Sequence, residues 1–311
     1  MRELEEETEL APVGWELPRR ERGLWSDALR RLSRNRLAMA ALIVLVLIAV
    51  IAVAADYLGV LERYDPYQDQ DYEAVQEGPS LEHFFGTDNL GRDNWSRVLT
   101  GVEISLQIGL GTQVLVLLFG VAVGVAAGLG GKTTDNLLMR LTDITYAFPD
   151  LLFIILLRSV LFERDWPILT NPRLQVMLAI AMVNWTTIAR LVRGQMLSLW
   201  ERDYVTAAKT LGASNFRIVV RHMLPNTLGP VIVAFTFGIP IAIFAEAALG
   251  FIGFGLPPPT ASLGRLVSDG YAYIQVNYWV VVFPAAAIAL LMLCFTFLGD
   301  GLRDALDPRQ R

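Results

Sequence analysis

The sequence has few of the residues that form disulfides, metal sites and charged binding surfaces. It contains one cysteine, Cys294, and two histidines in 311 residues. One cysteine cannot form an internal disulfide framework or a cysteine-based zinc site. Charged residues make up 18% of the chain, less than the roughly 25% of typical soluble domains, and the net charge is -5. This composition excludes a DNA-binding protein and predicts no nucleic-acid partner.

Hydrophobic residues are abundant instead, at 54% of the chain, and they are gathered into long runs. The run 37–55 contains no charged residue, as expected for a helix that crosses a lipid bilayer. We therefore predict an all-α membrane protein with six transmembrane helices. The predicted spans are 37–56, 104–129, 138–161, 174–197, 228–250 and 278–298.

Lysine and arginine are divided unequally between the two sides of this arrangement. If the N-terminus is cytoplasmic, nineteen of the 26 basic residues lie inside. The outer segment 56–103 then carries eleven acidic residues against three arginines. Because cytoplasmic loops are enriched in lysine and arginine, both termini are predicted to be cytoplasmic. His83 and His222 then lie on opposite sides of the membrane, so no transition-metal site is expected.

Composition also divides the chain into regions. The basic amphipathic stretch 24–36 fits a helix lying along the inner membrane surface, or equally a positive anchor that fixes the topology. The predicted regions are a disordered cytoplasmic tail (1–23), an amphipathic helix with the first span and an outer segment (24–103), a core of five spans with an inner loop at 198–227 (104–300), and a cytoplasmic tail (301–311).

Three glycines recur every four residues in the second predicted span: Gly120, Gly124 and Gly128. On a helix they share one face, which allows another helix to approach closely. We predict a packing face here, and this face carries no information about a substrate.

The inner connection 201–226 predicts two short helices separated by a glycine. Asp203 is expected to cap the first helix, and Gly212 to end it in a left-handed conformation. Ser214 is expected to cap the second helix, whose apolar residues recur at helical spacing, and Pro225 to end it. The result would be a compact hairpin with an apolar docking surface, although an ordinary loop on the membrane is the alternative.

Four polar residues within or near the predicted spans are candidates for a translocation path or gate: Glu246, Asn184, Asp143 and Asp150. An ionised acid at mid-bilayer costs at least ~2.5–3.5 kcal/mol, so it should face the bundle interior or water. For Glu246, two roles remain open: a pore or outer gate, and a structural ion pair or helix-end bond, for which Arg265 is the candidate partner. Asp143 is expected to pair with Arg140 or an arginine of the inner side, and a packing role suits Asn184 equally well.

The inner hairpin resembles the signature cytoplasmic loop of ABC importer permeases. In that loop Glu-Ala-Ala is followed, after three residues, by Gly, and nine residues later by Ile, one further residue and Leu-Pro. The residues in register here are Ala207, Ala208, Gly212, Leu224 and Pro225. Thr206 stands at the usual Glu position and His222 at the usual Ile position.

Further motifs extend the resemblance over about 25–308, nearly the whole chain. FGTDNLGRDNWSR, RLTDITYAFPDLL, WTTIARLVRGQ and AEAALGFIGFGLPPPTASLGRL occur in the order found in the dipeptide, oligopeptide and nickel importer subfamily. Within it, the chain is similar to the permease that has an extra N-terminal span and outer segment. The resemblance implies the type I ABC importer fold, also called MetI-like.

The resemblance also implies a function and partners. Such a permease forms the translocation path for peptides with a second permease, in a bacterial or archaeal inner membrane, and an external binding protein delivers the substrate. It has no catalytic residue and no cofactor, because one or two kinds of separate ATPase subunit bind ATP and Mg. The implied ATPase-coupling residues are Asp203, Tyr204, Ala207, Ala208, Lys209, Leu211, Gly212, Ala213, Leu224 and Pro225.

Two other classes of function are the alternatives. A secondary transporter or channel driven by an ion gradient would also be a helical membrane protein, but no convincing repeat relates the two halves of the chain. A membrane-embedded enzyme would need clustered catalytic residues at one membrane depth, and the sequence shows no such cluster.

Overall fold

The computed structural model describes residues 24–58, 64–163 and 170–307, and within these ranges the chain forms helices and loops without a regular strand. The predicted disordered tail, 1–23, lies outside them. The helices are α1 (Leu24–Arg34), α2 (Arg36–Leu58), α3 (Asn94–Leu129), α4 (Lys132–Ala147), α5 (Asp150–Glu163), α6 (Pro172–Trp200), α7 (Asp203–Thr210), α8 (Asn215–Ile218), the π-helical turn η1 (Val219–Met223), α9 (Leu224–Ile252), α10 (Leu263–Tyr271) and α11 (Trp279–Leu306).

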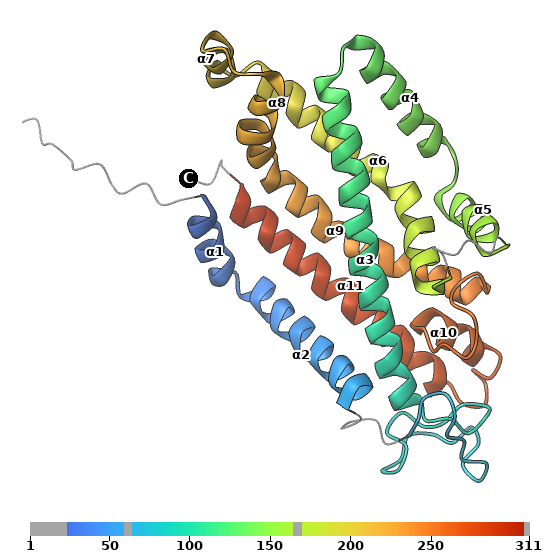
Figure 1. Cartoon of the computed structure of the whole chain (residues 1–311). Coiled ribbons are helices and arrows are strands. Elements are labelled where there is room, and N and C mark those ends of the chain that lie inside the picture. Colours follow the sequence, from blue (N-terminus) through green and yellow to red (C-terminus); the bar gives the residue numbers. More distant parts are fainter. Residues whose placement is uncertain (1–23, 59–63, 164–169, 308–311) are drawn as a thin grey trace, which may run out of the picture.

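Five helical segments in the described residues are long and apolar enough to cross a membrane. They correspond to five of the six predicted spans and run side by side in the bundle (Figure 1). The segments are Arg36–Ala55, Asn94–Leu129, Pro172–Trp200, Asn215–Ile252 and Trp279–Leu306.

The predicted third span, 138–161, is divided between two helices. Phe148, between α4 and α5, has extended backbone angles of φ -86° and ψ 143°. Because Pro149 follows, Phe148 is disfavoured from the helical region, and α4 ends there. The chain turns at this point (Figure 1), and with 16 and 14 residues neither helix is as long as the other spans.

Helix α3 begins well before the predicted start of the second span at 104. Asp93 caps it by accepting a hydrogen bond from the backbone N–H of Ser96 at 2.8 Å. Its first turns contain Arg97 and Glu103, which are 2% and 3% exposed. These polar residues interrupt the apolar pattern, but both are buried in the fold, and Arg97 contacts Asp88 of the outer segment and lies 3.9 Å from Asp269 of α10, so the helix extends beyond the apolar run.

The predicted glycine face is confirmed, and its partner is α6. A Cβ placed on Gly120 would lie 2.6 Å from the Cβ of Ile188, and one on Gly128 would lie 2.7 Å from the Cβ of Met196. Real Cβ atoms do not approach this closely, so α3 and α6 can pack at this distance only with glycine at these positions.

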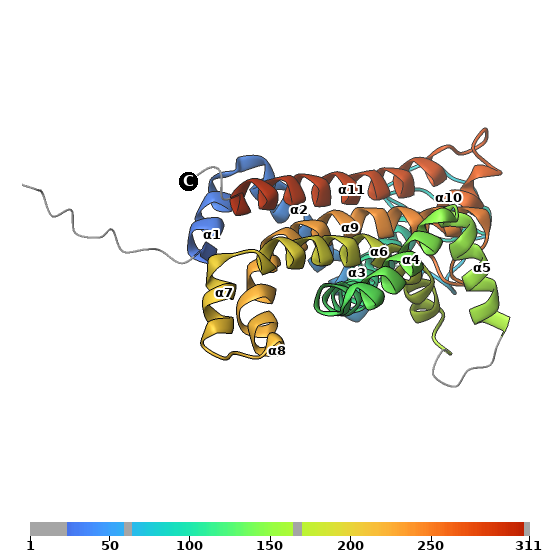
Figure 2. The ribbon, with the colours of Figure 1, turned by 90° about the horizontal axis from the view of Figure 1, so that it is seen from above.

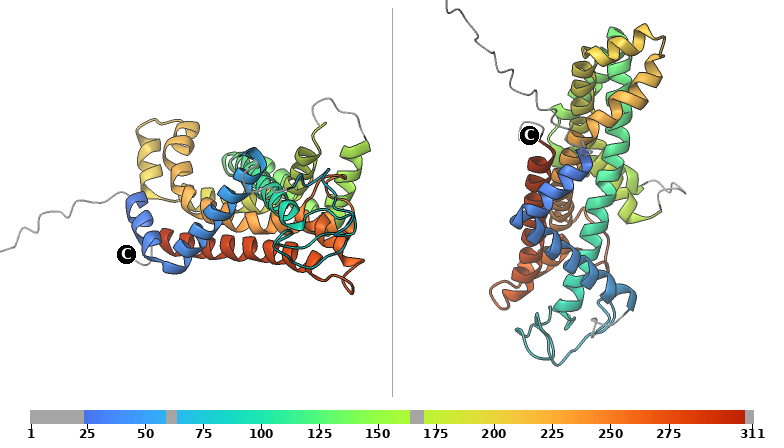
Figure 3. Two further views of the ribbon diagram at one scale, coloured as in Figure 1. Left: turned by 90° about the horizontal axis from the view of Figure 1, so that it is seen from below. Right: turned by 90° about the vertical axis from the view of Figure 1, so that its left-hand side faces the viewer.

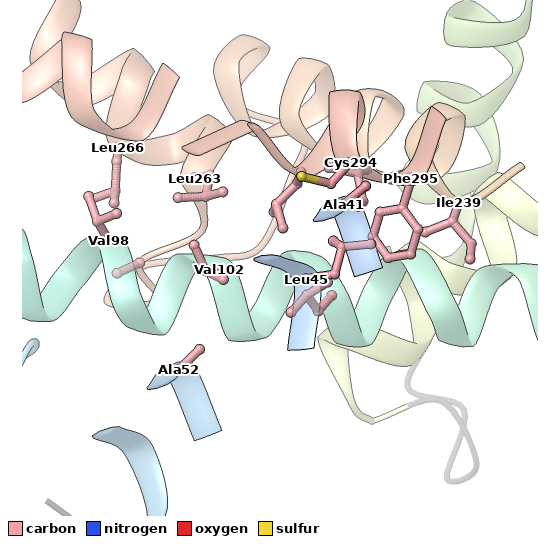
Figure 4. Packing of buried hydrophobic residues seen from close by; sticks show 14 residues of the cluster. Ala41, Leu45, Ala52, Val98, Val102, Ile239, Leu263, Leu266, Cys294 and Phe295 are labelled. Carbon is pink, nitrogen blue, oxygen red and sulfur yellow. The ribbon is translucent and has the colours of Figure 1, made fainter. Parts of the chain in front are cut away.

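A second core joins α2, α3, α9 and α11. Figure 4 shows side chains from these helices and from the start of α10 converging on one cluster. Its labelled members are Ala41, Leu45, Ala52, Val98, Val102, Ile239, Leu263, Leu266, Cys294 and Phe295. Cys294 is thus a buried packing residue.

The two ends of the bundle differ. The α7–α8 hairpin, α1 and the C-terminal end of α11 lie at one end, and the outer segment and α10 lie at the other (Figure 1). Seen from above and from below, the hairpin projects to one side of the packed helices (Figures 2 and 3).

Candidate functional site

The α7–α8 hairpin is built by the local sequence, as predicted at Gly212. Gly212 has φ +80°, a left-handed conformation that residues with a side chain rarely adopt. The N–H of Gly212 donates to the carbonyl of Lys209 at 2.9 Å, and the N–H of Ala213 donates to Ala208 at 3.0 Å. These two bonds form a Schellman motif, which ends α7. Ser214 caps α8 by accepting from the N–H of Arg217 at 3.4 Å.

Apolar side chains attach the hairpin to the bundle. Val205 on α7 and Ile218 on α8 have 0% exposure and belong to one cluster with Met196 and Met223. Trp200 donates from its Nε1 to the carbonyl of Gly128 at 3.0 Å, which links the base of the hairpin to the end of α3. The hairpin is therefore packed firmly against α6 and linked to the end of α3.

The outer face of the hairpin exposes three large side chains that no element of the described residues covers. Leu211 is 88% exposed, Phe216 is 71% exposed and Tyr204 is 38% exposed. Ala207, on the same short helix, is also exposed. Lys209 places its Nζ 4.2 Å from the centre of the Trp200 ring, so its side chain lies against the base of the hairpin. Exposed apolar residues on a rigid projection are typical of a docking surface.

Two of the predicted helix boundaries in this region are wrong. Asp203 is the first residue of α7, and the capping position is occupied by Arg202, whose side chain makes no capping hydrogen bond. Asp203 instead contributes a negative charge to the first turn, where the helix dipole favours it.

Pro225 does not end the second helix. The chain continues from α8 through η1 into α9, with Leu224 and Pro225 in the first turn of α9. Proline lacks an N–H and its ring crowds the carbonyl of the preceding turn. The wider π-helical turn just before Leu224 and Pro225 relieves this conflict, and so the helical backbone continues unbroken from α8 into the fifth span, although α8 and α9 point in different directions (Figure 2).

Glu246 is buried inside the bundle. It has 0% exposure, and its Oε2 accepts a hydrogen bond from Ser105 Oγ of α3 at 3.2 Å. The expected ion pair with Arg265 is wrong, because Arg265 donates from Nε to Asp269 at 2.8 Å, one turn along α10. This position joins α9 to α3 and favours the structural role over a gate.

Glu246→Gln is expected to leave transport and thermal stability nearly unchanged, because the amide oxygen still accepts the bond from Ser105. Glu246→Leu leaves that hydroxyl unpaired and should cost about 1–3 kcal/mol of stability. Uptake assays and thermal unfolding of the purified variants measure the two effects. A gate that depends on negative charge would instead lose transport in Glu246→Gln without losing stability.

The other three path candidates are not gathered around Glu246. Asp143 and Asp150 are exposed on α4 and α5, and Asn184 is half-buried on α6. Asp143 accepts a hydrogen bond from Arg190 Nη2 at 2.9 Å, and so its partner is an arginine of α6 instead of Arg140. The role of these residues in a path stays a prediction.

A second ion pair holds α4 against α6 before the predicted third span. Arg193 Nη2 donates to Asp135 Oδ2 at 2.6 Å, and its Nε donates to Asp135 Oδ1. This hydrogen bonding from Arg193 lowers the pKa of the Asp135 carboxyl from its ordinary 3.8.

The pKa of Asp135 is lower in the folded than in the unfolded chain, so the pair stabilises the fold above about pH 4 and this stabilisation is lost as the pH falls. We expect the gain to be about 1 kcal/mol or less, because both side chains are partly exposed. Thermal unfolding of the wild type and Asp135→Asn between pH 7 and pH 3 measures it. The difference between them should shrink at low pH, and a constant difference would contradict the assignment.

A network of buried charges near the outer end was not predicted. Arg97 contacts Asp88 through its Nη1, and Arg92 Nη2 lies 2.8 Å from the same carboxylate. His83, which is 2% exposed, lies 2.9 Å from Asp93 through its Nδ1. The dense Asp, Arg and Gly content of FGTDNLGRDNWSR was the available signal, because a folded outer segment needs such internal pairs.

Comparison with known proteins decides the family. Residues 120–311 match the family described as "Binding-protein-dependent transport system inner membrane component". The chain belongs to this family of ABC importer permeases. Residues 23–79 also match the N-terminal transmembrane domain of oligopeptide transport permease C, the extra N-terminal region expected from the resemblance.

Several curated proteins of this permease family are similar along most of their length. The oligopeptide transport system permease protein OppC of Bacillus subtilis (strain 168) is 42% identical over 288 residues, covering 93% of this chain and 90% of that protein. The dipeptide transport system permease protein DppC of Alkalihalophilus pseudofirmus is 40% identical over 288 residues, covering 92% and 90%. OppC of Escherichia coli (strain K12) is 40% identical over 292 residues, covering 93% of each.

The fold of the permease has a solved counterpart. An inward-facing structure of the MetNI methionine ABC transporter superposes with a TM-score of 0.55 at 20% identity, covering 68% of this chain and 96% of that one. At this identity the likeness shows the fold alone, and it confirms the MetI-like architecture. The family assignment replaces the alternative of an ion-gradient-driven transporter or channel, and the chain is a transport subunit.

Proposed function

We propose that this permease pairs with a second permease to form the path for peptides in an ATP-driven importer of a bacterial or archaeal cell membrane. An external binding protein supplies the peptide, and one or two kinds of ATPase subunit bind ATP and Mg and dock on the α7–α8 hairpin. The chain itself holds no cofactor. The named relatives, which are oligopeptide and dipeptide permeases, support the peptide as the substrate.

The observation that carries the proposal is the mechanical continuity of the hairpin with α9. The exposed residues Leu211 and Phe216 offer an apolar surface to a partner, while Val205 and Ile218 fix the hairpin to the bundle. Because α8, η1 and α9 are continuous, movement of an ATPase against the hairpin would tilt a membrane span. Such a lever converts closure of two ATPases into a change at the translocation path.

The proposal also places both termini and the hairpin in the cytoplasm. The distribution of lysine and arginine supports this orientation, and α1, the hairpin and the end of α11 lie at one end of the bundle. Labelling of single cysteines introduced at exposed Phe216 and at exposed Leu81 of the outer segment, in a Cys294→Ser background, tests it. A membrane-impermeant reagent added to intact cells should modify the cysteine that replaces Leu81 and leave the cysteine that replaces Phe216 unmodified.

The function itself is tested with the complete transporter. The permease is co-purified with the second permease, ATPases and binding protein encoded beside it, and any bound ligand is identified by mass spectrometry. Proteoliposomes should then accumulate that peptide only with ATP, and a hydrolysis-deficient ATPase should abolish accumulation. Uptake driven by an ion gradient without ATP, or co-purification of a non-peptide solute, would contradict the proposal.

A further inference from the structure

The end of the bundle that carries the hairpin also contains a cleft of about 630 Å³. It lies between α1, α6, the first turns of α9 and the end of α11, and its walls are largely apolar. The residues that line it include Trp25, Ala28, Arg31, Pro225, Val233 and Arg303. Neither the docking surface of the hairpin nor the buried acid of α9 accounts for it.

Helix α1 forms a fixed wall of this cleft. Ala28 is 8% exposed, so α1 is packed on the bundle and is not a loose appendage. Its junction with α2 lies against Gly301 of α11, where a Cβ would come within 2.3 Å of the Cβ of Ala38. Asn35 caps α2 by accepting from the N–H of Ala38 at 3.2 Å. The cleft is therefore a feature of the packed fold.

Two arginines and two aspartates line the cleft: Arg31, Arg303, Asp27 and Asp307. In the part of the chain that the structure describes, the side chains of Arg31 and Arg303 form no hydrogen bond or ion pair. Asp307 has an interaction of its own, and Asp304 lies beside Arg31 in an adjoining hollow, but among the described residues neither arginine is ion-paired with an acid. Two guanidinium groups beside apolar walls favour an anion with an apolar body, and their planar donor pattern suits phosphate.

We propose that this cleft binds the phosphate headgroup of a glycerophospholipid, with Arg31 and Arg303 as its ligands. Trp25 is 48% exposed and Leu29 is 66% exposed on α1, as expected for an amphipathic helix at a membrane surface. The apolar wall near Val233 then takes the upper part of an acyl chain. This inference rests on the proposed function in one respect, which is that the end of the bundle carrying the hairpin lies at the inner leaflet of the membrane.

Occupation of the cleft would affect coupling, because the lipid would lie against the first turns of α9, which follow the hairpin. Pro225 and Pro230 of α9 line the cleft, and Pro225 is the second residue after the end of η1. A headgroup wedged between α1 and this first turn limits how far α9 can tilt. The coupling of ATP hydrolysis to transport should therefore depend on the lipid.

The test measures lipid retention by the intact purified complex. After exchange into phosphatidylglycerol nanodiscs and mild detergent extraction, native mass spectrometry counts the bound lipids. The double variant R31Q/R303Q should retain phosphatidylglycerol about tenfold less than the wild type. The matched control is R30Q/R34Q, which removes the same charge from exposed positions of α1 outside the cleft, and it should retain lipid like the wild type.

Equal losses in the two double variants would overturn the proposal, since they would show attraction to surface charge alone. Displacement of the lipid by millimolar glycerol 3-phosphate or inorganic phosphate would overturn it in favour of a soluble phosphate ligand. Unchanged retention in R31Q/R303Q would also overturn it. Thermal unfolding shows whether each variant is folded. Because retention is measured without transport, its failure is distinguishable from a failure of peptide uptake.

Discussion

Replacing Gly212 with valine should abolish ATP-driven transport while the protein still inserts into the membrane. Gly212 holds φ +80° at the turn between α7 and α8, and a left-handed conformation costs a β-branched residue roughly 1–3 kcal/mol. The backbone can escape this cost by changing the turn, because the hairpin tip has few contacts. The exposed surface around Leu211 and Phe216 then no longer faces its partner in one fixed orientation.

Two further variants separate this effect from a general loss of stability. Gly212→Asn should keep most of the activity, because asparagine tolerates the left-handed region better than valine does. Gly131→Val is the matched control, since Gly131 has φ -63° and a Cβ there meets nothing within 4 Å. Uptake in proteoliposomes and co-purification of the ATPases are the measurements. We expect at least about a tenfold loss of uptake in Gly212→Val only, and unchanged uptake with unchanged ATPase binding would contradict the coupling role.

The sequence predicts the hairpin well because its signals are local. The turn at Gly212 and the cap at Ser214 depend on hydrogen bonds between residues three to five positions apart, so their roles follow from the nearby sequence. The predictions for Asp203 and Pro225 were wrong for the same reason, because the local pattern does not show the conformation of the chain on either side of it. At Pro225 the π-helical turn of η1 keeps the helix continuous, and no pattern of residues in the sequence predicts such a turn.

The membrane region shows the same limit on a larger scale. Hydropathy detects five spans because each is a long apolar run, but the predicted third span joined the end of the more polar helix α4 to the apolar helix α5 and so missed the division at Phe148. It also missed the start of α3, since Arg97 and Glu103 are polar residues that are buried only in the folded structure. The partner of Glu246 depends on how α3 and α9 pack, which the sequence does not show. For this reason Arg265 was named as a partner, whereas Ser105 of α3 forms the hydrogen bond to Glu246.

The long-range contact with the largest predicted energetic effect is the glycine face of α3. Gly124→Ala adds one carbon that would lie 2.7 Å from both the carbonyl oxygen of Ala189 and the Cβ of Val192. Neither atom can move without shifting α6, so we expect a loss of about 1–3 kcal/mol in thermal stability and a matching loss of folded protein.

Gly111→Ala is the matched control on the same helix. Its added carbon would lie 2.7 Å from the Sδ of Met177, an atom in a flexible side chain that can rotate away. Alanine is favoured over glycine within a helix by about 1 kcal/mol, so this variant should be as stable as the wild type or slightly more stable. Thermal unfolding and the yield of monodisperse protein in detergent compare the two. Similar stability in both would show that α3 and α6 do not pack this closely in the membrane, whereas loss confined to Gly124→Ala follows from the backbone contact. Because α6 leads directly into the hairpin, the same contact sets the position from which the hairpin moves, and Gly124→Ala protein that does fold should couple ATP hydrolysis to uptake less efficiently.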